Sequence, residues 1–299
     1  MENEILSLCI PTRNRAEWLA IALNRINEEV LQYGIGAESL KVYISDNAST
    51  DNTQQVVQRF QSGFCLSYSR NETNIGGNEN ICRCPDLARG KYVWIMGDDD
   101  SVLPGSLPYI LDILQKHRLA LFLNRGELSA SGFKLPAHFK NFREFARECT
   151  RVNPHTLLAH SLISANIFRS DFFDLQVAEF RIKSNYGHMY AMVDRMTDDA
   201  GGVYVADRAT IKVRNSSTDP VDGAIWPTHL EMENSWRDYL GWLKEKFDLK
   251  DLDPGKVNTY TRLAVYNEFK SHPIRILLHY GAFLRYKKTY KTLWRLIIG

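Results

Sequence analysis

The chain has 299 residues, of which 44% are hydrophobic and 24% are charged, and its formal net charge is +2. This is the usual composition of a globular protein, and the near balance of charge excludes a chain-wide basic surface for nucleic acid. The residues from Lys270 onward carry seven Lys or Arg and no acid. Subtracting those seven charges from +2 leaves −5 on the first 269 residues.

The N-terminus, Met-Glu-Asn-Glu-Ile-Leu, has no basic region and no long apolar core, so we expect no signal peptide. No apolar run approaches the ~20 residues that cross a bilayer. The five cysteines have irregular spacing, which indicates reduced thiols in the cytosol rather than a disulfide framework or a zinc site. We therefore expect a cytoplasmic protein.

Up to residue 125, strand-like and helix-like segments alternate. The expected strands cover 5–10, 41–45, 65–68, 92–96 and 119–123. The expected helices cover 15–32, a segment after residue 50 that carries Val56, Val57 and Phe60, 77–87 and 107–115. This alternation predicts an α/β fold with a mainly parallel sheet flanked by helices.

The later part of the chain is less regular. Helices are expected at 142–149 and 186–196, and strands at 162–168, 203–206 and 210–213. A segment rich in Ser, Asp and Pro follows, and we place the end of the main domain, 1–215, there. The remainder, 216–299, is expected to be a helical appendage with helices at 229–247, 256–270 and 274–297.

Polar clusters follow four of the expected strands, each where its strand ends. In order, they are residues 11–15, 46–51, 71–77 and 98–100. Because ligands of parallel sheets gather at the carboxyl ends of the strands, we expect these clusters to converge on one edge.

The last cluster is a run of three carboxylates, Asp98, Asp99 and Asp100. Their mutual repulsion and desolvation are unfavourable, and a divalent cation would relieve both, since hard cations take oxygen ligands. The competing interpretation is a solvated acidic turn before a helix that starts after Pro104.

The other clusters carry groups suited to a nucleotide. Asp46 can accept a hydrogen bond from a base, although it can equally be a turn acid that caps the next helix. Thr12, Asn14 and Arg15 can hold a base or phosphates. Glycines at 76–77 permit close backbone approach at a helix N-terminus that favours anions. Together these groups fit a nucleoside diphosphate.

The same motifs resemble those of GT-A fold glycosyltransferases of family 2, which invert the anomeric centre. They are Ile-Pro-Thr-Arg-Asn-Arg, Ser-Asp-Asn-Ala-Ser-Thr-Asp-Asn-Thr, Asn-x-Gly-Gly-x-x-x-Asn and Gly-Lys-Tyr-Val-x-x-x-x-Asp-Asp-Asp-x-x-x-Pro. The resemblance covers residues 5–125 and weakens toward 214. The variant Trp-Ile-Met-Gly-Asp-Asp-Asp is similar to that of abequosyltransferase-like O-antigen enzymes.

The resemblance implies a site for the donor nucleotide and a Mn²⁺ or Mg²⁺ ion. The implied donor-binding residues are Pro11, Thr12, Asn14, Arg15, Asp46, Asn74, Gly76 and Asp98. The aspartates would be the family's DXD motif, with Asp98 near the ribose and Asp99 or Asp100 on the metal. All three acids remain candidate metal ligands.

The resemblance also implies a general base on the helix at 186–196, where the family usually has an acidic pair. Here that position holds His188 and Met189. His188 suits the task because its unperturbed pKa is ~6.5, and Asp194 is the second candidate. The competing interpretation of His188 is an ordinary half-buried histidine.

The C-terminal helix expected at 274–297 has aromatic residues along one face and basic residues around the rest. This pattern favours binding to an anionic membrane surface, and packing on the core is the alternative. A lipid-linked acceptor would make such docking useful, at the inner face of the cell membrane.

Together with these patterns, the resemblance implies a metal-dependent enzyme that moves a sugar from a nucleoside-diphosphate donor to a hydroxyl of a glycan or lipid-linked acceptor. The resemblance and the basic C-terminal helix place this expected activity in bacterial O-antigen or capsule synthesis. One rival is a sugar nucleotidyltransferase, but the glycine-rich triphosphate loop of that class is absent after the first strand. The other rival is a non-catalytic nucleotide-sugar-binding or membrane scaffold protein.

Overall fold

The computed structural model describes residues 4–60, 63–124, 135–152, 157, 162–181, 186–213 and 229–254. The chain divides into two units, Met1–Leu252 and Asp253–Gly299, and the described residues lie in the first unit apart from Asp253 and Pro254. The helices expected at 256–270 and 274–297 lie outside the described residues.

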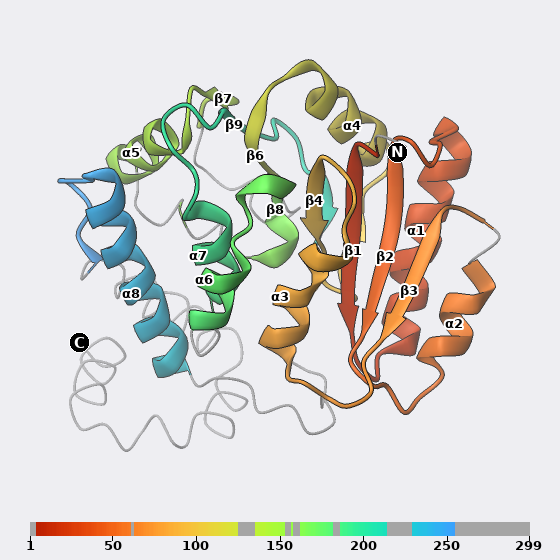
Figure 1. Ribbon diagram of the computed structural model, residues 1–299. Coiled ribbons are helices and arrows are strands. Elements are labelled where there is room, and N and C mark those ends of the chain that lie inside the picture. The colour runs from red at the N-terminus through yellow and green to blue at the C-terminus, as the bar shows by residue number, and fades with distance from the viewer. Residues whose placement is uncertain are drawn as a thin grey trace, which may run out of the picture. The chain divides into compact units, whose positions relative to one another are not determined.

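A mostly parallel sheet forms the centre of the described part (Figure 1). In spatial order its eight strands are β3 (Leu66–Arg70), β2 (Leu40–Asp46), β1 (Leu6–Thr12), β4 (Tyr92–Ile95), β8 (Asn166–Arg169), β6 (Leu119–Leu123), β9 (Gly202–Val205) and β7 (His138–Phe139). Two are antiparallel to their neighbours: β8, which lies between β4 and β6, and β7 at the edge. A small ribbon pairs β5 (Ser101–Val102) with β10 (Ile211–Lys212).

Helices flank the sheet on both faces, which confirms the predicted fold class (Figure 1). They are α1 (Ala16–Tyr33), α2 (Thr53–Phe60), α3 (Gly77–Leu87), α4 (Ser106–Lys116), α5 (Phe142–Val152), α6 (Leu175–Phe180), α7 (Gly187–Val193) and α8 (His229–Phe247). Short 3₁₀ turns occur at Ile163–Ala165 and Ser170–Phe172. The strand expected at 162–168 therefore begins as a 3₁₀ turn and becomes extended at Asn166.

Alternation along the strands explains why helices cover both faces, because successive side chains of a strand point to opposite sides. Leu8 and Ile10 of β1 are fully buried in the core that includes α1 and α4. The intervening Cys9 points to the other face, where its Sγ donates to the carbonyl of Cys84 in α3 at 3.5 Å. All five cysteines are free thiols, as expected.

Helix α8 packs against α7 through aromatic side chains. The rings of Tyr190 and Tyr239 are 5.0 Å apart, and those of Tyr186 and Trp236 are 5.4 Å apart. Helix α8 belongs to the first unit, and the domain boundary predicted at residue 215 stays a prediction. Within the described ranges, every helix lacks the length or the apolar character that a membrane span requires.

A buried glutamate joins α1 to the start of α4. Glu29 is 4% exposed, and its carboxylate accepts hydrogen bonds from the backbone N–H groups of Gly105 at 2.7 Å and Leu107 at 3.2 Å. The first N–H groups of a helix have no partner within that helix, so Glu29 caps α4 from a distance. This contact also anchors the short connection between β5 and α4, and β5 is the strand that directly follows the three aspartates.

We expect Glu29→Ala to lower the free energy of unfolding by about 1–3 kcal/mol, because it leaves two N–H groups without their acceptor. Urea denaturation measures this loss. The matched control is Glu28→Ala, which removes an exposed carboxylate paired with Arg25 and should change stability by less than about 0.5 kcal/mol. Equal effects of the two substitutions would contradict the capping role.

Candidate active site

Hydrogen bonds join the loop after β1 to the acids after β4. The hydroxyl of Thr12 donates to Asp98 Oδ2 at 2.7 Å, and Arg15 Nη1 donates to Asp98 Oδ1 at 2.7 Å. Strands β1 and β4 are parallel neighbours, so their carboxyl ends share one edge of the sheet. The predicted convergence of these two clusters is confirmed.

The loop after β1 is also bonded to the loop after β2. Asn14 accepts a hydrogen bond from the N–H of Thr50 at 2.7 Å, and its own N–H donates to Ser49 Oγ at 3.0 Å. Arg13 Nη1 donates to the carbonyls of Asn47 at 2.6 Å and Ala48 at 2.9 Å. Pro11, the residue before the last one of β1, is half-buried and precedes this loop in the sequence.

Asp46 is completely buried, and both of its oxygens have partners. Oδ1 accepts from the N–H of Ser49 at 2.9 Å, which is the turn-forming bond typical of aspartate. Oδ2 accepts from the hydroxyl of Tyr68 at 2.6 Å and lies 3.5 Å from Arg70 Nε. Burial and the bond to Asp46 raise the pKa of Tyr68. Contact between Asp46 and a base stays a prediction.

Amide side chains connect the clusters after β2 and β3. Asn47 donates to Asn74 Oδ1 at 2.8 Å and to the carbonyl of Gly76 at 3.1 Å. Asn71 donates to Asn47 Oδ1 at 3.1 Å. Gly76 has φ +100°, a conformation that strongly favours glycine, and α3 begins directly after it. All four predicted clusters therefore meet at one edge.

The three aspartates have different surroundings. Asp98 is 4% exposed, and burial raises its pKa to about 6, against the opposing effects of Arg15 and Thr12. Asp100 is 8% exposed and accepts a hydrogen bond from Ser164 Oγ. Asp99 Oδ2 lies 3.3 Å from Arg15 Nη2. The other oxygen, Asp99 Oδ1, has no hydrogen-bond partner among the described residues.

Because Gly97 has no side chain, the carboxylates of Asp99 and Asp100 can lie close to its backbone. A Cβ at this position would lie 3.1 Å from Asp99 Oδ1 and 3.3 Å from Asp100 Oδ2, closer than most real contacts. Its N–H also donates to Ser164 Oγ at 2.9 Å.

Ser164 is a residue of this site that the sequence did not reveal. Its carbonyl accepts from Trp94 Nε1 at 2.9 Å and from Asn124 Nδ2 at 3.1 Å. Asn124 in turn accepts from the hydroxyl of Thr210 at 2.9 Å. This buried network fixes the position of Asp100. No local pattern marks Ser164, because its partners Trp94, Asp100 and Asn124 lie 40 to 70 positions away in the chain.

The described side chains offer a divalent cation a carboxylate oxygen but not a complete set of protein ligands. In the part of the chain that the structure describes, no three His, Cys, Asp or Glu side chains form a metal-ligating group. However, Asp99 Oδ1 is a hard oxygen donor beside two further carboxylates, whose negative charge Arg15 neutralises only in part. These residues therefore fit a divalent cation that takes its remaining ligands from a diphosphate and water.

The two predicted bases lie at opposite ends of α7. His188 is in the first turn and is 8% exposed. Asp194 follows the last residue of the helix, about 9 Å further along its axis at 1.5 Å per residue. The carboxylate of Asp194 lies 3.5 Å from Lys246 Nζ of α8 and so already has a positively charged partner.

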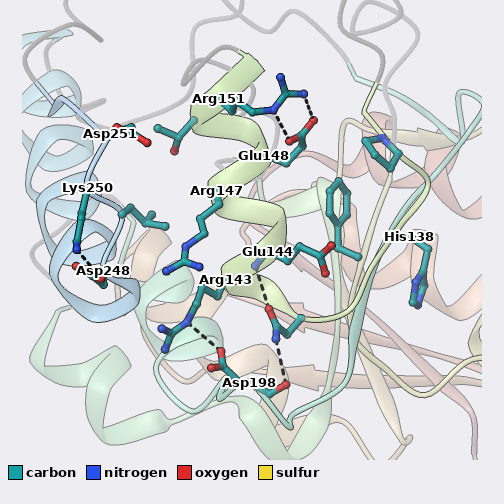
Figure 2. Close-up of a pocket in the computed structure, with 15 residues that line it drawn as sticks. His138, Arg143, Glu144, Arg147, Glu148, Arg151, Asp198, Asp248, Lys250 and Asp251 are labelled. Atoms are coloured by element: carbon teal, nitrogen blue, oxygen red, sulfur yellow. Dashed lines mark hydrogen bonds and ion pairs between the residues drawn. The ribbon is translucent and has the colours of Figure 1, made fainter.

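A groove of about 1030 Å³ lies between α5 and the turn after α8 (Figure 2). Its charges are largely paired: Arg143 with Asp198 at 3.0 Å, and Arg151 with Glu148 at 2.6 Å. Asp198 precedes β9, which runs in the same direction as β1, so the groove opens at the amino ends of the strands. It is therefore distinct from the site at the carboxyl ends.

The model of the family described as Glycosyl transferase family 2 matches residues 7–171, more than half of the chain. Over 125 residues the chain is 35% identical to abequosyltransferase RfbV of Salmonella typhimurium, an alignment that covers 41% of this chain and 36% of that relative. Over 305 residues it is 24% identical to GalNAc(5)-diNAcBac-PP-undecaprenol beta-1,3-glucosyltransferase of Campylobacter jejuni, covering 96% and 88% of the two chains.

Two solved structures share the fold. TarS of S. aureus in complex with UDP-GlcNAc has a TM-score of 0.56 at 16% identity, covering 80% of this chain and 66% of that chain. The mannosyltransferase PcManGT from Pyrobaculum calidifontis, in complex with GDP-Man and Mn²⁺, has a TM-score of 0.51 at 16% identity, covering 96% and 82%. These likenesses confirm the predicted GT-A fold.

We expect Ser164→Ala to lower the free energy of unfolding by about 1–3 kcal/mol, because the buried Asp100 carboxylate loses a donor. Ser170→Ala is the matched control, since Ser170 is exposed and, among the described residues, its hydroxyl donates to the carbonyl of Lys91 alone, at 3.2 Å. Chemical denaturation of both variants tests this, and a Ser164→Ala protein as stable as the control would argue against the network.

Proposed function

We propose that this chain, which belongs to glycosyl transferase family 2, is a metal-dependent inverting glycosyltransferase that moves a sugar from a nucleoside-diphosphate donor to an acceptor hydroxyl. The observation that carries the proposal is the convergence of the four strand-end clusters, with Asp98 bonded to both Thr12 and Arg15. A similar bacterial transferase is named for an undecaprenol-linked glycan, which supports a lipid-linked acceptor, and we propose a role in O-antigen or capsule synthesis.

The donor would lie across this edge of the sheet. Pro11, Thr12, Asn14, Arg15 and Asp46 would surround the nucleotide. Asn74 and Gly76 would line its far side, where the N-terminus of α3 favours the negative diphosphate. Asp98 would lie near the ribose.

Asp99 is the proposed metal ligand, because Asp98 and Asp100 hold neighbouring side chains through the bonds given above. Mn²⁺ or Mg²⁺ at this position would neutralise the charge that develops on the departing diphosphate. The donor-bound complexes of structurally similar proteins, one of which holds Mn²⁺, support a divalent cation beside the donor.

His188 is the proposed general base. It would take the proton of the acceptor hydroxyl while that oxygen attacks the anomeric carbon and the bond to the diphosphate breaks. Asp194 is the weaker candidate, because its carboxylate is paired with Lys246. The acceptor would be a glycan or a lipid-linked sugar at the inner face of the membrane. Residues 274–297 would bind the enzyme to that membrane surface.

Asp99→Asn should abolish metal-dependent binding of the donor nucleotide while leaving the fold intact, because the carboxylate is half-buried and makes one described contact, with Arg15. A thermal-shift panel of UDP, CDP, GDP and dTDP with and without Mn²⁺ measures this. Wild type should gain about 2.7 kcal/mol from the matching nucleotide at a hundredfold excess over Kd. If no nucleotide stabilises wild type, the proposed donor site is refuted.

His188→Ala should lower kcat by about 10²–10⁴-fold, the usual contribution of a general base, with the nucleotide affinity retained. Asp194→Asn is the matched control and should keep most of the activity. The rate of nucleoside diphosphate release gives the kcat of each variant. Full activity of His188→Ala would refute the assignment, and release of pyrophosphate would identify a nucleotidyltransferase instead.

A further inference from the structure

Arg15 bridges two of the carboxylates that form the candidate metal site. Its Nη1 lies 2.7 Å from Asp98 Oδ1, and its Nη2 lies 3.3 Å from Asp99 Oδ2. The Arg15 side chain is 16% exposed, so water screens these contacts only in part.

A different arginine, Arg13, bonds the loop after β1 to the loop after β2. It lies two residues earlier and donates to the carbonyls of Asn47 and Ala48. The described partners of the Arg15 guanidinium are the carboxylates of Asp98 and Asp99. Arg15 therefore acts on the charge of the acidic cluster.

A divalent cation on Asp99 would lie next to this guanidinium, because both would contact the same carboxylate. The two positive charges repel each other, and they do so more strongly in a largely buried site than in water. A nucleoside diphosphate removes the conflict, since its phosphate oxygens can bind the cation and accept hydrogen bonds from Arg15 at the same time.

We propose that Arg15 is an internal counterion of the acidic cluster, which weakens cation binding by the free protein and makes binding of the cation and the nucleoside diphosphate mutually dependent. This inference rests on the proposed function, since it needs a cation on Asp99 and a diphosphate beside it. By thermodynamic reciprocity, each ligand then increases the affinity for the other by the same factor.

The test compares Mn²⁺ binding to full-length variants without nucleotide, measured by the electron paramagnetic resonance signal of free Mn²⁺. Arg15→Gln should bind Mn²⁺ about tenfold more tightly than wild type, equivalent to about 1.4 kcal/mol. Arg15→Lys keeps the positive charge and should stay within about threefold of wild type. Arg13→Gln is the matched control and should not tighten Mn²⁺ binding.

A second measurement adds the nucleoside diphosphate that stabilises wild type. It should tighten Mn²⁺ binding strongly in wild type and about tenfold less in Arg15→Gln. Unchanged or weaker Mn²⁺ binding by Arg15→Gln, with metal-dependent nucleotide binding intact in wild type, would overturn the counterion role alone. If Mn²⁺ does not change the nucleotide affinity of wild type at all, both this inference and the proposed metal site are refuted.

Discussion

The ion pair between Arg15 and the buried Asp98 is the constraint on which the site depends. A carboxylate buried at the end of a strand is unfavourable without compensation, and here Thr12 and Arg15 compensate both of its oxygens. These partners come from the loop after β1, so the bonds form only when β1 and β4 are correctly paired. Strand pairing and the geometry of the acidic cluster are thus coupled.

Around this pair, the site is built mainly from hydrogen bonds between separate loops. Asn47 and Asn71 connect the ends of β2 and β3, and Asn80 of α3 donates to the carbonyl of Ser45 at 2.9 Å. Such a network is favourable when nearly every donor and acceptor is satisfied. A pre-formed edge lowers the entropy lost when a ligand is ordered on it, which suits a proposed nucleotide site.

Much of the fold could be predicted from local patterns. The helix over Gly77–Leu87 and the strand over Leu119–Leu123 have the predicted bounds, because their apolar periodicity and flanking turn residues are local signals. The antiparallel placement of β8 between β4 and β6 could not be predicted, since β8 follows both strands in the chain. The role of Ser164 could not be predicted either, because its hydrogen-bond partners are also distant in the chain.

The sequence by itself determined the alternation of strands and helices, the family, and the polar groups that follow the strands, because these depend on residue type and short spacing. Only the tertiary structure decided how the three aspartates differ. Asp98 binds Arg15, Asp100 binds Ser164, and Asp99 keeps an oxygen without a described partner. Adjacent residues of one type are equivalent in a sequence, and the partners that distinguish them come from segments 64 to 83 positions away.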